Sequence, residues 1–224
     1  MNNPWRSLPE SEPYVLKEDA GMLESFTFKE TTRPRLEILP SPYLGRPEST
    51  EIIILSLNPG FKKWDLDAQE NNRLYVREKR LSLFFQSAYP WYLLDPRFVN
   101  YPGYNWWYSK LRMMIESFGI DTVSHKVMCV QYFPYQSEEF QHQQIIPSQE
   151  YSFYLVKQAI SKQKIIIQFR GDKHWIDSIP ELQMYDRKII IRSQKNGKKL
   201  RNASISSKNM RDEDWNIIIS ALRL

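Results

Sequence analysis

The stretch EIIILSLNPGF, Glu51–Phe61, decides the fold class. Its unbroken β-branched run, Ile52–Ile54, is typical of a strand that is buried on both faces of a parallel sheet. The run stops at a turn, because Pro59 has no N–H for a ladder and Gly60 permits a positive φ or the close approach of a ligand. We therefore expect Asn58 at the rim of a sheet, where its amide offers both a donor and an acceptor.

Further short, β-rich apolar runs predict three more strands, at Lys126–Phe133, Lys164–Phe169 and Arg187–Arg192. Helical patterns lie between and after them, at Leu74–Gln86, Trp106–Phe118, Ser148–Lys162 and Asp212–Leu222. This alternation predicts right-handed crossovers and a mostly parallel α/β sheet that is covered on both faces. In such folds ligands bind beyond the carboxyl ends of the strands.

Length and composition indicate one domain. The chain has 224 residues and is 42% hydrophobic, enough for one substantial core. We expect a Pro- and charge-rich N-terminal arm at residues 1–50, packed on a single domain at residues 51–224. The one cysteine, Cys129, excludes an intramolecular disulfide and a Cys-based zinc cluster. With no signal-like start and no run of about 20 apolar residues, we expect a cytoplasmic monomer without a membrane partner.

Positive charge is concentrated late in the chain. The net charge is +5, and no carboxylate occurs between Asp186 and Asp212. The basic residues of this segment predict an attraction for a polyanion such as DNA, single or double stranded. A solvated basic loop is the alternative interpretation. The candidate contacts to a nucleic-acid backbone are Lys198, Lys199, Arg201 and Lys208.

The first strand end carries an amide close to aromatic residues. Asn58 and Pro59-Gly60 are followed by Phe61 and Trp64. An amide beside aromatic faces is what a pocket for a flat heteroaromatic ring requires. The alternative is that this segment is only a strand-ending turn whose aromatic side chains fill the core. Acids soon after the turn, at Asp65, Asp67 and Glu70, either activate water or cap the following helix.

The second and third strand ends also carry polar and aromatic groups. The second strand is followed by FPYQS, which supplies Phe133, Tyr135 and Ser137. The end of the second strand therefore carries aromatic and polar residues, as the end of the first strand does. At the third end Arg170 precedes Gly171, and a guanidinium there suits a phosphate or a developing anion. A structural ion pair of Arg170 with Asp172 or with the C-terminal region is the alternative.

Hydroxyl and amide side chains precede the last predicted helix. They are Ser204, Ser206, Ser207 and Asn209. Such a segment gathers hydrogen-bond donors near a helix start, or it is an extended loop that merely caps the helix. The three histidines, His125, His142 and His174, show no metal-ligand spacing, and no GxSxG, P-loop or GxGxxG motif is present. We therefore expect no metal and no cofactor.

Taken in order, these segments resemble the uracil-DNA glycosylase-like superfamily, and more closely a bacterial branch of it. The resemblance rests on LNPG, WWYSKLR, FPYQS, IPSQEYSFYLVKQAI, QFRG and SISSKNM, and it spans most of Leu36–Met210. It implies a three-layer α/β/α fold with a central four-stranded, mostly parallel sheet. The implied activity is hydrolysis of the N-glycosidic bond of a damaged or deaminated base in DNA, without metal or cofactor.

The resemblance also implies roles for single residues. Asn58 would position the attacking water, and Phe61, with Tyr135, would pack against the base. From the residues themselves, we expect Arg170 or Ser206 to contact an anion or a phosphate. The final loop would stabilise the leaving base and insert into DNA, with Met210 as its wedge.

Two departures weaken the functional side of the resemblance. The segment Arg192–Met210 lacks the histidine, followed by Pro and Ser, that many active members carry, and Asn58 replaces the acid of the more strongly activating version of the first motif. Loss of one stabilising donor typically costs about 10²–10³ in rate, so these departures would weaken catalysis without forbidding it. The alternatives are a non-catalytic module that binds nucleic acid or a nucleobase, and an enzyme that acts on a free nucleoside or nucleotide.

Overall fold

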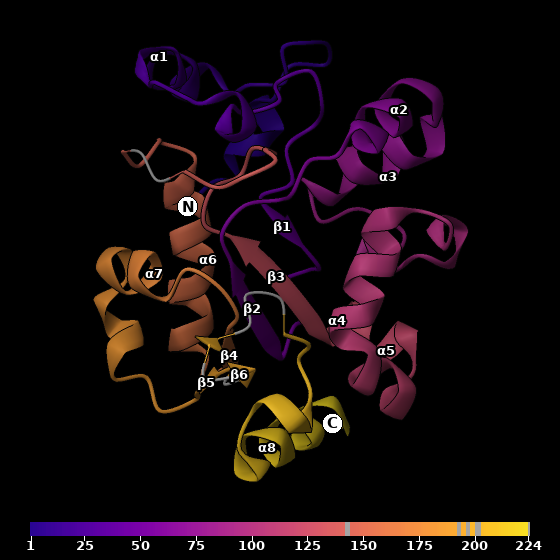
Figure 1. Cartoon of the computed structure of the whole chain (residues 1–224), viewed down its shortest axis with the longest axis vertical. Coiled ribbons are helices and arrows are strands. Elements are labelled where there is room, and N and C mark those ends of the chain that lie inside the picture. The colour runs from indigo at the N-terminus through magenta and orange to yellow at the C-terminus, as the bar shows by residue number, and fades with distance from the viewer. Residues whose placement is uncertain (142–143, 192–193, 196–197, 200–202, 224) are drawn as a thin grey trace.

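A mixed sheet of five strands, in the order β1-β3-β2-β4-β5, forms the centre of the computed structural model (Figure 1). The structure describes residues 1–141, 144–191, 194–195, 198–199 and 203–223, and of 194–195 and 198–199 only the backbone. The parallel strands are β2 (Ile52–Ser56), β3 (Val127–Gln131), β4 (Ile165–Gln168) and β5 (Lys188–Ile190). The predicted α/β class and its four parallel strands are thus confirmed.

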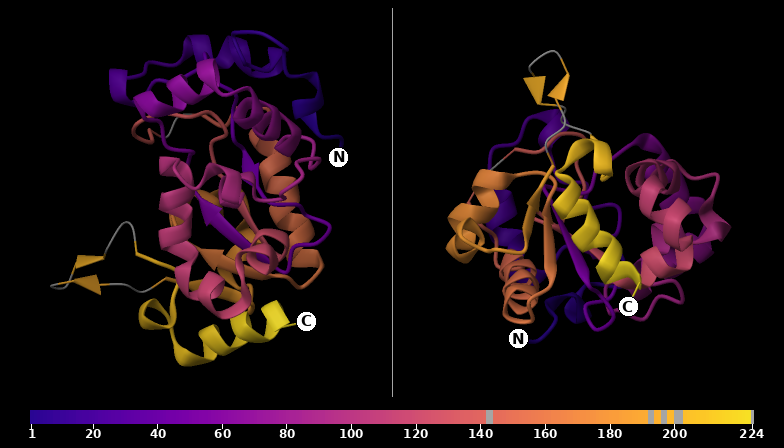
Figure 2. Two further views of the ribbon diagram at one scale, coloured as in Figure 1. Left: turned by 90° about the vertical axis from the view of Figure 1, so that its right-hand side faces the viewer. Right: turned by 90° about the horizontal axis from the view of Figure 1, so that it is seen from below.

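The fifth strand was not predicted. β1 (Tyr43–Leu44) pairs antiparallel with β3, so that Leu44 lies opposite Cys129. It is only two residues long and lies in a Pro-rich segment, which gives no strand signal. A separate two-stranded ribbon, β6 (Gln194–Lys195) and β7 (Lys198–Lys199), projects from the body of the molecule (Figure 2).

Helices and short 3-10 turns connect the strands. The helices are α1 (Lys17–Ser25), α2 (Lys63–Asn71), α3 (Arg73–Ser82), α4 (Pro102–Phe118), α5 (Ile120–Lys126), α6 (Gln149–Ser161), α7 (Asp172–Ser178) and α8 (Asp212–Arg223). The 3-10 turns are Pro4–Ser7, Glu30–Thr32, Tyr92–Leu94, Pro96–Phe98, Pro180–Gln183 and Ser207–Asn209. The predicted helices correspond to α3, α4, α6 and α8. No helix in the described part of the chain combines the length and the hydrophobicity needed to cross a membrane.

Alternate side chains of the central strand enter two different cores. Ile52 and Ile54 pack in a cluster with residues of α4, α5 and α8, whereas Ile53 and Leu55 pack in a cluster with residues of α6 and α7. Helices therefore cover both faces of the sheet (Figures 1 and 2). All residues of β2 are buried, as expected for a central strand of a covered parallel sheet.

The strand order creates a switch point beside β2. From β2 the chain proceeds to β3 on one side, and through α6 it then crosses to β4 on the other side. In open α/β sheets ligands bind at the carboxyl ends of the strands next to such a reversal. The residues that follow β2, β3 and β4 are thereby brought to one edge.

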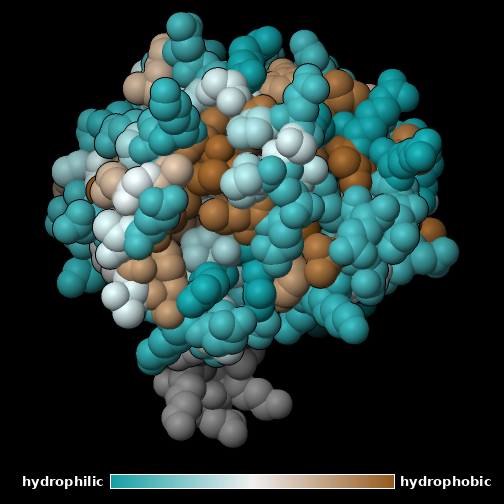
Figure 3. Space-filling view, turned by 90° about the horizontal axis from the view of Figure 1, so that it is seen from above, coloured by the Kyte–Doolittle hydropathy of each residue, from teal (hydrophilic) through white to brown (hydrophobic). Residues whose placement is uncertain are grey.

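Within the first 50 residues, α1 lies at the upper end of the molecule in Figure 1, whereas β1 lies beside β3 in the sheet. Trp5 and Leu16 are buried in the α6 and α7 cluster, and the Tyr43 hydroxyl donates to Leu83 O at 2.5 Å. Seen from above, this end shows hydrophobic side chains at its centre, surrounded by hydrophilic ones (Figure 3). The segment predicted as an arm thus contributes to the core and supplies β1.

Candidate functional site

A cavity of about 350 Å³ lies at the carboxyl ends of β2, β3 and β4. It has aromatic walls, formed by Phe61, Trp64, Tyr75, Tyr92, Trp106 and Trp107. Its uncharged polar lining is Ser41, Ser56, Asn58, Gln131 and Gln136, and its charged lining is Lys62, Asp65, Glu138 and Arg170. Pro59 and Gly60 also line it. The cavity therefore lies where the parallel-sheet rule places a ligand.

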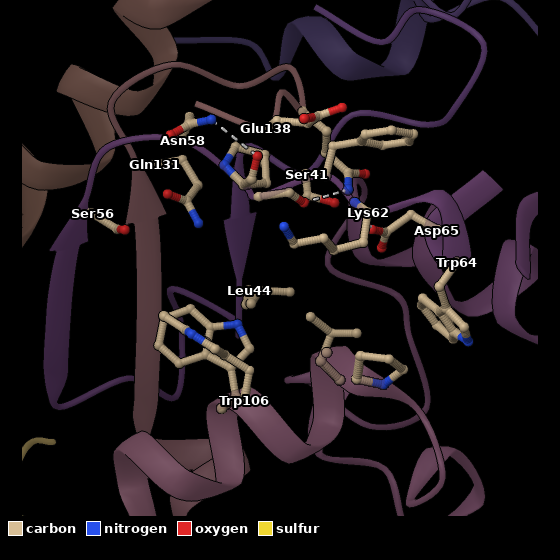
Figure 4. A pocket seen from close by; sticks show the side chains of 18 of the residues that line it. Ser41, Leu44, Ser56, Asn58, Lys62, Trp64, Asp65, Trp106, Gln131 and Glu138 are labelled. Carbon is tan, nitrogen blue, oxygen red and sulfur yellow. Dashed lines mark hydrogen bonds between the residues drawn. The ribbon is translucent and has the colours of Figure 1, made fainter. Parts of the chain in front are cut away.

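The polar groups are distributed over two sides of the cavity (Figure 4). Asn58 and Gln131 lie on one side, near the strand ends, whereas Lys62 and Asp65 lie on the other, near the start of α2. Trp106 of α4 lies below them. A flat ligand above the indole ring would thus have amides on one side and charged groups on the other.

The segments that follow β2 and β3 are hydrogen-bonded to each other next to this cavity. Asn58 Nδ2 donates to Ser137 Oγ at 2.9 Å, and the backbones of Gly60 and Ser137 form a parallel bridge. Phe61 N donates to Ser137 O at 3.0 Å. The backbone pairing of β2 with β3 thus continues beyond the ends of the two strands, and the bond to Ser137 fixes the orientation of the Asn58 amide. Ser137 is buried and lies outside the cavity lining.

The positive φ considered for Gly60 is found instead at Gly171. Gly60 is not among the glycines with positive φ, and no atom lies within 4 Å of the place of a Cβ there. Gly171 has a φ of 72°, and a Cβ would lie 2.4 Å from Leu57 Cδ2. The turn after β2 therefore does not require a left-handed residue, whereas the turn after β4 does.

Gln131, the last residue of β3, was not singled out from the sequence. Its side chain is 4% exposed, lines the cavity, and has an Oε1 with no hydrogen-bond partner among the described residues. An unpaired buried acceptor costs about 1–3 kcal/mol, so a donor from a ligand would stabilise it. The available signal was a single amide inside the otherwise apolar run Val127–Phe133.

Arg170 enters the same cavity from the end of β4. Its Cζ lies 5.6 Å from the centre of the Trp106 ring and 5.5 Å from that of Phe169. Burial lowers the pKa of the Arg170 guanidinium, but an arginine remains a cation at any ordinary pH. The structure thus brings Asn58 and Arg170 to one cavity.

A buried lysine lies behind the charged side of the cavity. Lys79 Nζ donates to Gln136 Oε1 at 2.5 Å, and burial lowers the pKa of Lys79 to about 8, opposed by the negative charge of Asp65. Burial raises the pKa of Asp65, while Lys79 opposes this shift. Asp65 also accepts the Lys62 N–H at 2.7 Å, so it caps α2 and lines the cavity. Asp67 and Glu70 are exposed on α2, outside the lining.

Two aromatic residues predicted to bind the substrate lie elsewhere. Tyr135 is fully buried, and its hydroxyl donates to Asp19 Oδ2 at 2.7 Å and accepts the Leu16 N–H at 3.2 Å. Phe133 packs edge-on against Tyr135, with ring centres 5.9 Å apart. Both belong to the α6 and α7 cluster and are absent from the cavity lining. The N-terminal segment supplies the carboxylate that holds the tyrosine there.

The final loop also lies outside the cavity lining. Asn209 Nδ2 donates to Ser204 O at 2.7 Å and to Ser206 Oγ at 3.2 Å, so these three predicted site residues form a cluster among themselves. Lys208 is exposed, whereas Met210 packs against the core. Arg201 lies outside the described residues, and only the backbone is described for Lys198 and Lys199.

The described residues contain no group of three or more His, Cys, Asp or Glu side chains that would hold a metal ion; His142 lies outside them. The cavity offers aromatic faces, amides, two cationic groups and two carboxylates, which together suit a flat ligand with both hydrogen-bond donors and acceptors. No protein-family model, no curated protein and no solved structure gives a significant match to this chain.

Proposed function

We propose that the cavity binds a nucleobase, and that the chain hydrolyses the N-glycosidic bond of a damaged or deaminated base in DNA. The observation that carries this proposal is the buried Oε1 of Gln131, which has no partner among the described residues and lies in an aromatic-walled cavity beside Asn58. A nucleobase stacks on aromatic faces and offers N–H and C=O groups at its edge, which a side-chain amide matches.

The size of the cavity agrees with this ligand class. Its volume of about 350 Å³ is near the lower end of the range of roughly 300–1,000 Å³ that is usual for small-molecule sites. This favours a base or a nucleoside over a dinucleotide cofactor. The resemblance to uracil-DNA glycosylase-like proteins supports the same choice, since its LNPG and QFRG segments supply Asn58 and Arg170.

In the proposed reaction, the oxygen of a water molecule bonds to C1′ of the deoxyribose and the C–N bond breaks. The base leaves with the electron pair of that bond and takes up the proton that water loses. Asn58 would orient the water through its Oδ1, because Ser137 holds its Nδ2. Arg170 would stabilise the negative charge that develops on the base.

One observation favours a second candidate, a module that binds the base without hydrolysis. Ser204, Ser206 and Asn209 form hydrogen bonds to one another and lie outside the cavity lining. In this arrangement they donate nothing to a leaving base. Arg170 would then have to stabilise the negative charge of the leaving base.

The test is release of free base from single- and double-stranded oligonucleotides that contain uracil, hypoxanthine or other damaged bases. We expect release by the wild type, loss of release in Asn58→Ala, and normal release in Asn216→Ala, which changes an exposed amide on α8. Salt-sensitive binding of the same oligonucleotides without release would support the binding module. Absence of both binding and release would overturn both candidates.

A further inference from the structure

Two cations approach one indole ring at the edge of the cavity. Lys110 Nζ lies 5.4 Å from the centre of the Trp106 ring, and Arg170 Cζ lies 5.6 Å from it. Trp106 and Arg170 line the cavity, whereas Lys110, one turn further along α4, does not. A concentration of positive charge therefore adjoins the cavity on the side of β4.

The environment of these cations favours an anion. Both side chains are partly buried, and burial lowers the pKa of each. The charge of Arg170 also lowers the pKa of Lys110, so the two groups are close enough to repel each other. An anion that contacts both would offset this repulsion.

The final loop borders the same cations. The Ile205 N–H donates to Lys110 O at 2.9 Å, which holds the loop against this turn of α4. On either side of Ile205, the hydroxyls of Ser204 and Ser206 lie 3.3 Å apart. The loop expected from the sequence to contact DNA is therefore placed beside Lys110, next to the base cavity and not inside it.

We propose that Lys110 and Arg170 form a phosphate-binding subsite beside the base cavity, so that the substrate is a nucleotide unit and not a free base or a nucleoside. This inference rests on the proposed function for the identity of the ligand in the cavity. The lysine supplies a compact point charge and the arginine a planar fork, two complementary ways to bind phosphate oxygens. Because deoxyribose joins base and phosphate covalently, their subsites must adjoin.

The test uses an oligonucleotide that contains a stable abasic site, since it offers phosphates but no base and no bond to hydrolyse. We expect Lys110→Gln to weaken its binding roughly 10-fold, as for a lost hydrogen bond to a charged group. The slope of log Kd against log salt should fall by about 1. Lys110→Arg retains the charge and should retain the affinity. The matched control is Arg112→Gln, because Arg112 lies on the same helix, is exposed, and pairs with Glu116 at 3.7 Å.

A second arm separates phosphate from sugar and base. We expect deoxyuridine 5′-monophosphate to compete with the abasic oligonucleotide more strongly than deoxyuridine, and this difference to vanish in Lys110→Gln. Unchanged affinity and salt slope in Lys110→Gln, or equal competition by the two compounds, would overturn the subsite. Release of free base tests the proposed function separately. If Lys110→Gln weakens binding but the wild type releases no base, the phosphate subsite stands and only the proposed hydrolysis is overturned.

Discussion

The side-chain amide of Asn58 donates a hydrogen bond to Ser137 Oγ at 2.9 Å, although the two residues are 79 positions apart. Ser137 Oγ in turn donates to Glu139 O at 2.8 Å. These bonds fix the rotation of the Asn58 amide relative to the cavity. A group that orients water must itself be held, so Ser137 is a positioning residue for the proposed reaction.

Ser137→Ala removes both of these bonds. We expect the free energy of unfolding to fall by about 1–2 kcal/mol, because the hydroxyl is buried. Base release should show a lower kcat with little change in KM, since Asn58 Nδ2 then keeps only its longer bonds to Pro59 O at 3.2 Å and Ser137 O at 3.4 Å, and the amide orients the water less firmly. Urea denaturation and steady-state kinetics measure the two effects. Ser25→Ala, which removes an exposed bond to Met22 O, should change neither, and an unchanged stability in Ser137→Ala would contradict the buried bond.

Gln131→Leu should separate stability from ligand binding. The amide oxygen of Gln131 is buried without a partner among the described residues, so its removal should leave the free energy of unfolding unchanged or raise it by about 1 kcal/mol. Binding of the nucleobase should be lost, since the cavity then offers no amide at that position. Denaturation and calorimetric titration with free base provide the two readings.

Gln149 provides the matched control for Gln131. It is equally buried, but its Oε1 accepts the Ile146 N–H at 3.0 Å and its Nε2 donates to Tyr132 O at 2.8 Å. Gln149→Leu should therefore cost about 1–3 kcal/mol of stability. If both variants lose stability equally, the Gln131 amide makes interactions within the protein, and it is not reserved for a ligand.

Tyr135→Phe tests the placement of this ring in the core. It removes the donor to the buried Asp19 carboxyl and the acceptor of the Leu16 N–H. We expect a loss of roughly 1.5–3 kcal/mol of unfolding free energy, as for a hydrogen bond to a charged group. The partly exposed Tyr154, changed to Phe, should have little effect. Loss of base binding with unchanged stability would instead support the base-packing role predicted from the sequence.

The sequence predicted those features that depend on local pattern and on strand direction. The unbroken run Ile52–Ile54 identifies the central strand, and the carboxyl ends of parallel strands lie at one edge, which is why Asn58 and Arg170 meet. Trp106 is the first residue of a helix predicted from apolar spacing, yet its side chain is partly exposed and lines the cavity. Helical spacing identifies the buried stripe of a helix and does not show where a neighbouring element leaves a gap.

The contacts between residues far apart in the chain could not be predicted from the sequence. Nothing near Lys79 along the chain predicts that its ammonium is buried against Gln136, 57 positions away. Similarly, Tyr135 belongs to the core because Asp19, in the N-terminal segment, provides its partner. Short helices such as α5 and α7 have seven residues each, too few for an apolar period to show.

Lys79 should make stability depend on pH in the alkaline range. Burial lowers the pKa of Lys79 to about 8 from its ordinary value of 10.5. Between these values the unfolded chain binds more protons than the folded one, so the free energy of unfolding rises with pH. Relative to Lys79→Met, the wild type should gain stability from about pH 8 to about pH 10, at up to roughly 1.4 kcal/mol per pH unit.

Urea denaturation of the wild type and of Lys79→Met across this pH range measures the difference between their free energies of unfolding. The titration of other groups is common to both proteins and cancels in this difference. Lys17→Met, at an exposed lysine of α1, should differ from the wild type by an amount that does not vary with pH. A difference for Lys79→Met that stays constant, or that changes in the opposite direction, would contradict a lowered pKa.

Gly171→Ala should lower both stability and base release, although Gly171 does not line the cavity. The left-handed φ of 72° alone costs a non-glycine residue about 1–2 kcal/mol. The added methyl group would also lie 2.4 Å from Leu57 Cδ2, and Leu57 immediately precedes Asn58. We expect lower stability and a larger loss of base release than the destabilisation explains, because the displaced Leu57 moves the Asn58 amide. Gly60→Ala is the control, because a Cβ there meets no atom within 4 Å and stability should be retained. A stability loss of no more than about 1–2 kcal/mol, the cost of the φ alone, with base release lowered no further than that loss explains, would show that Leu57 yields to the methyl group without moving the strand end.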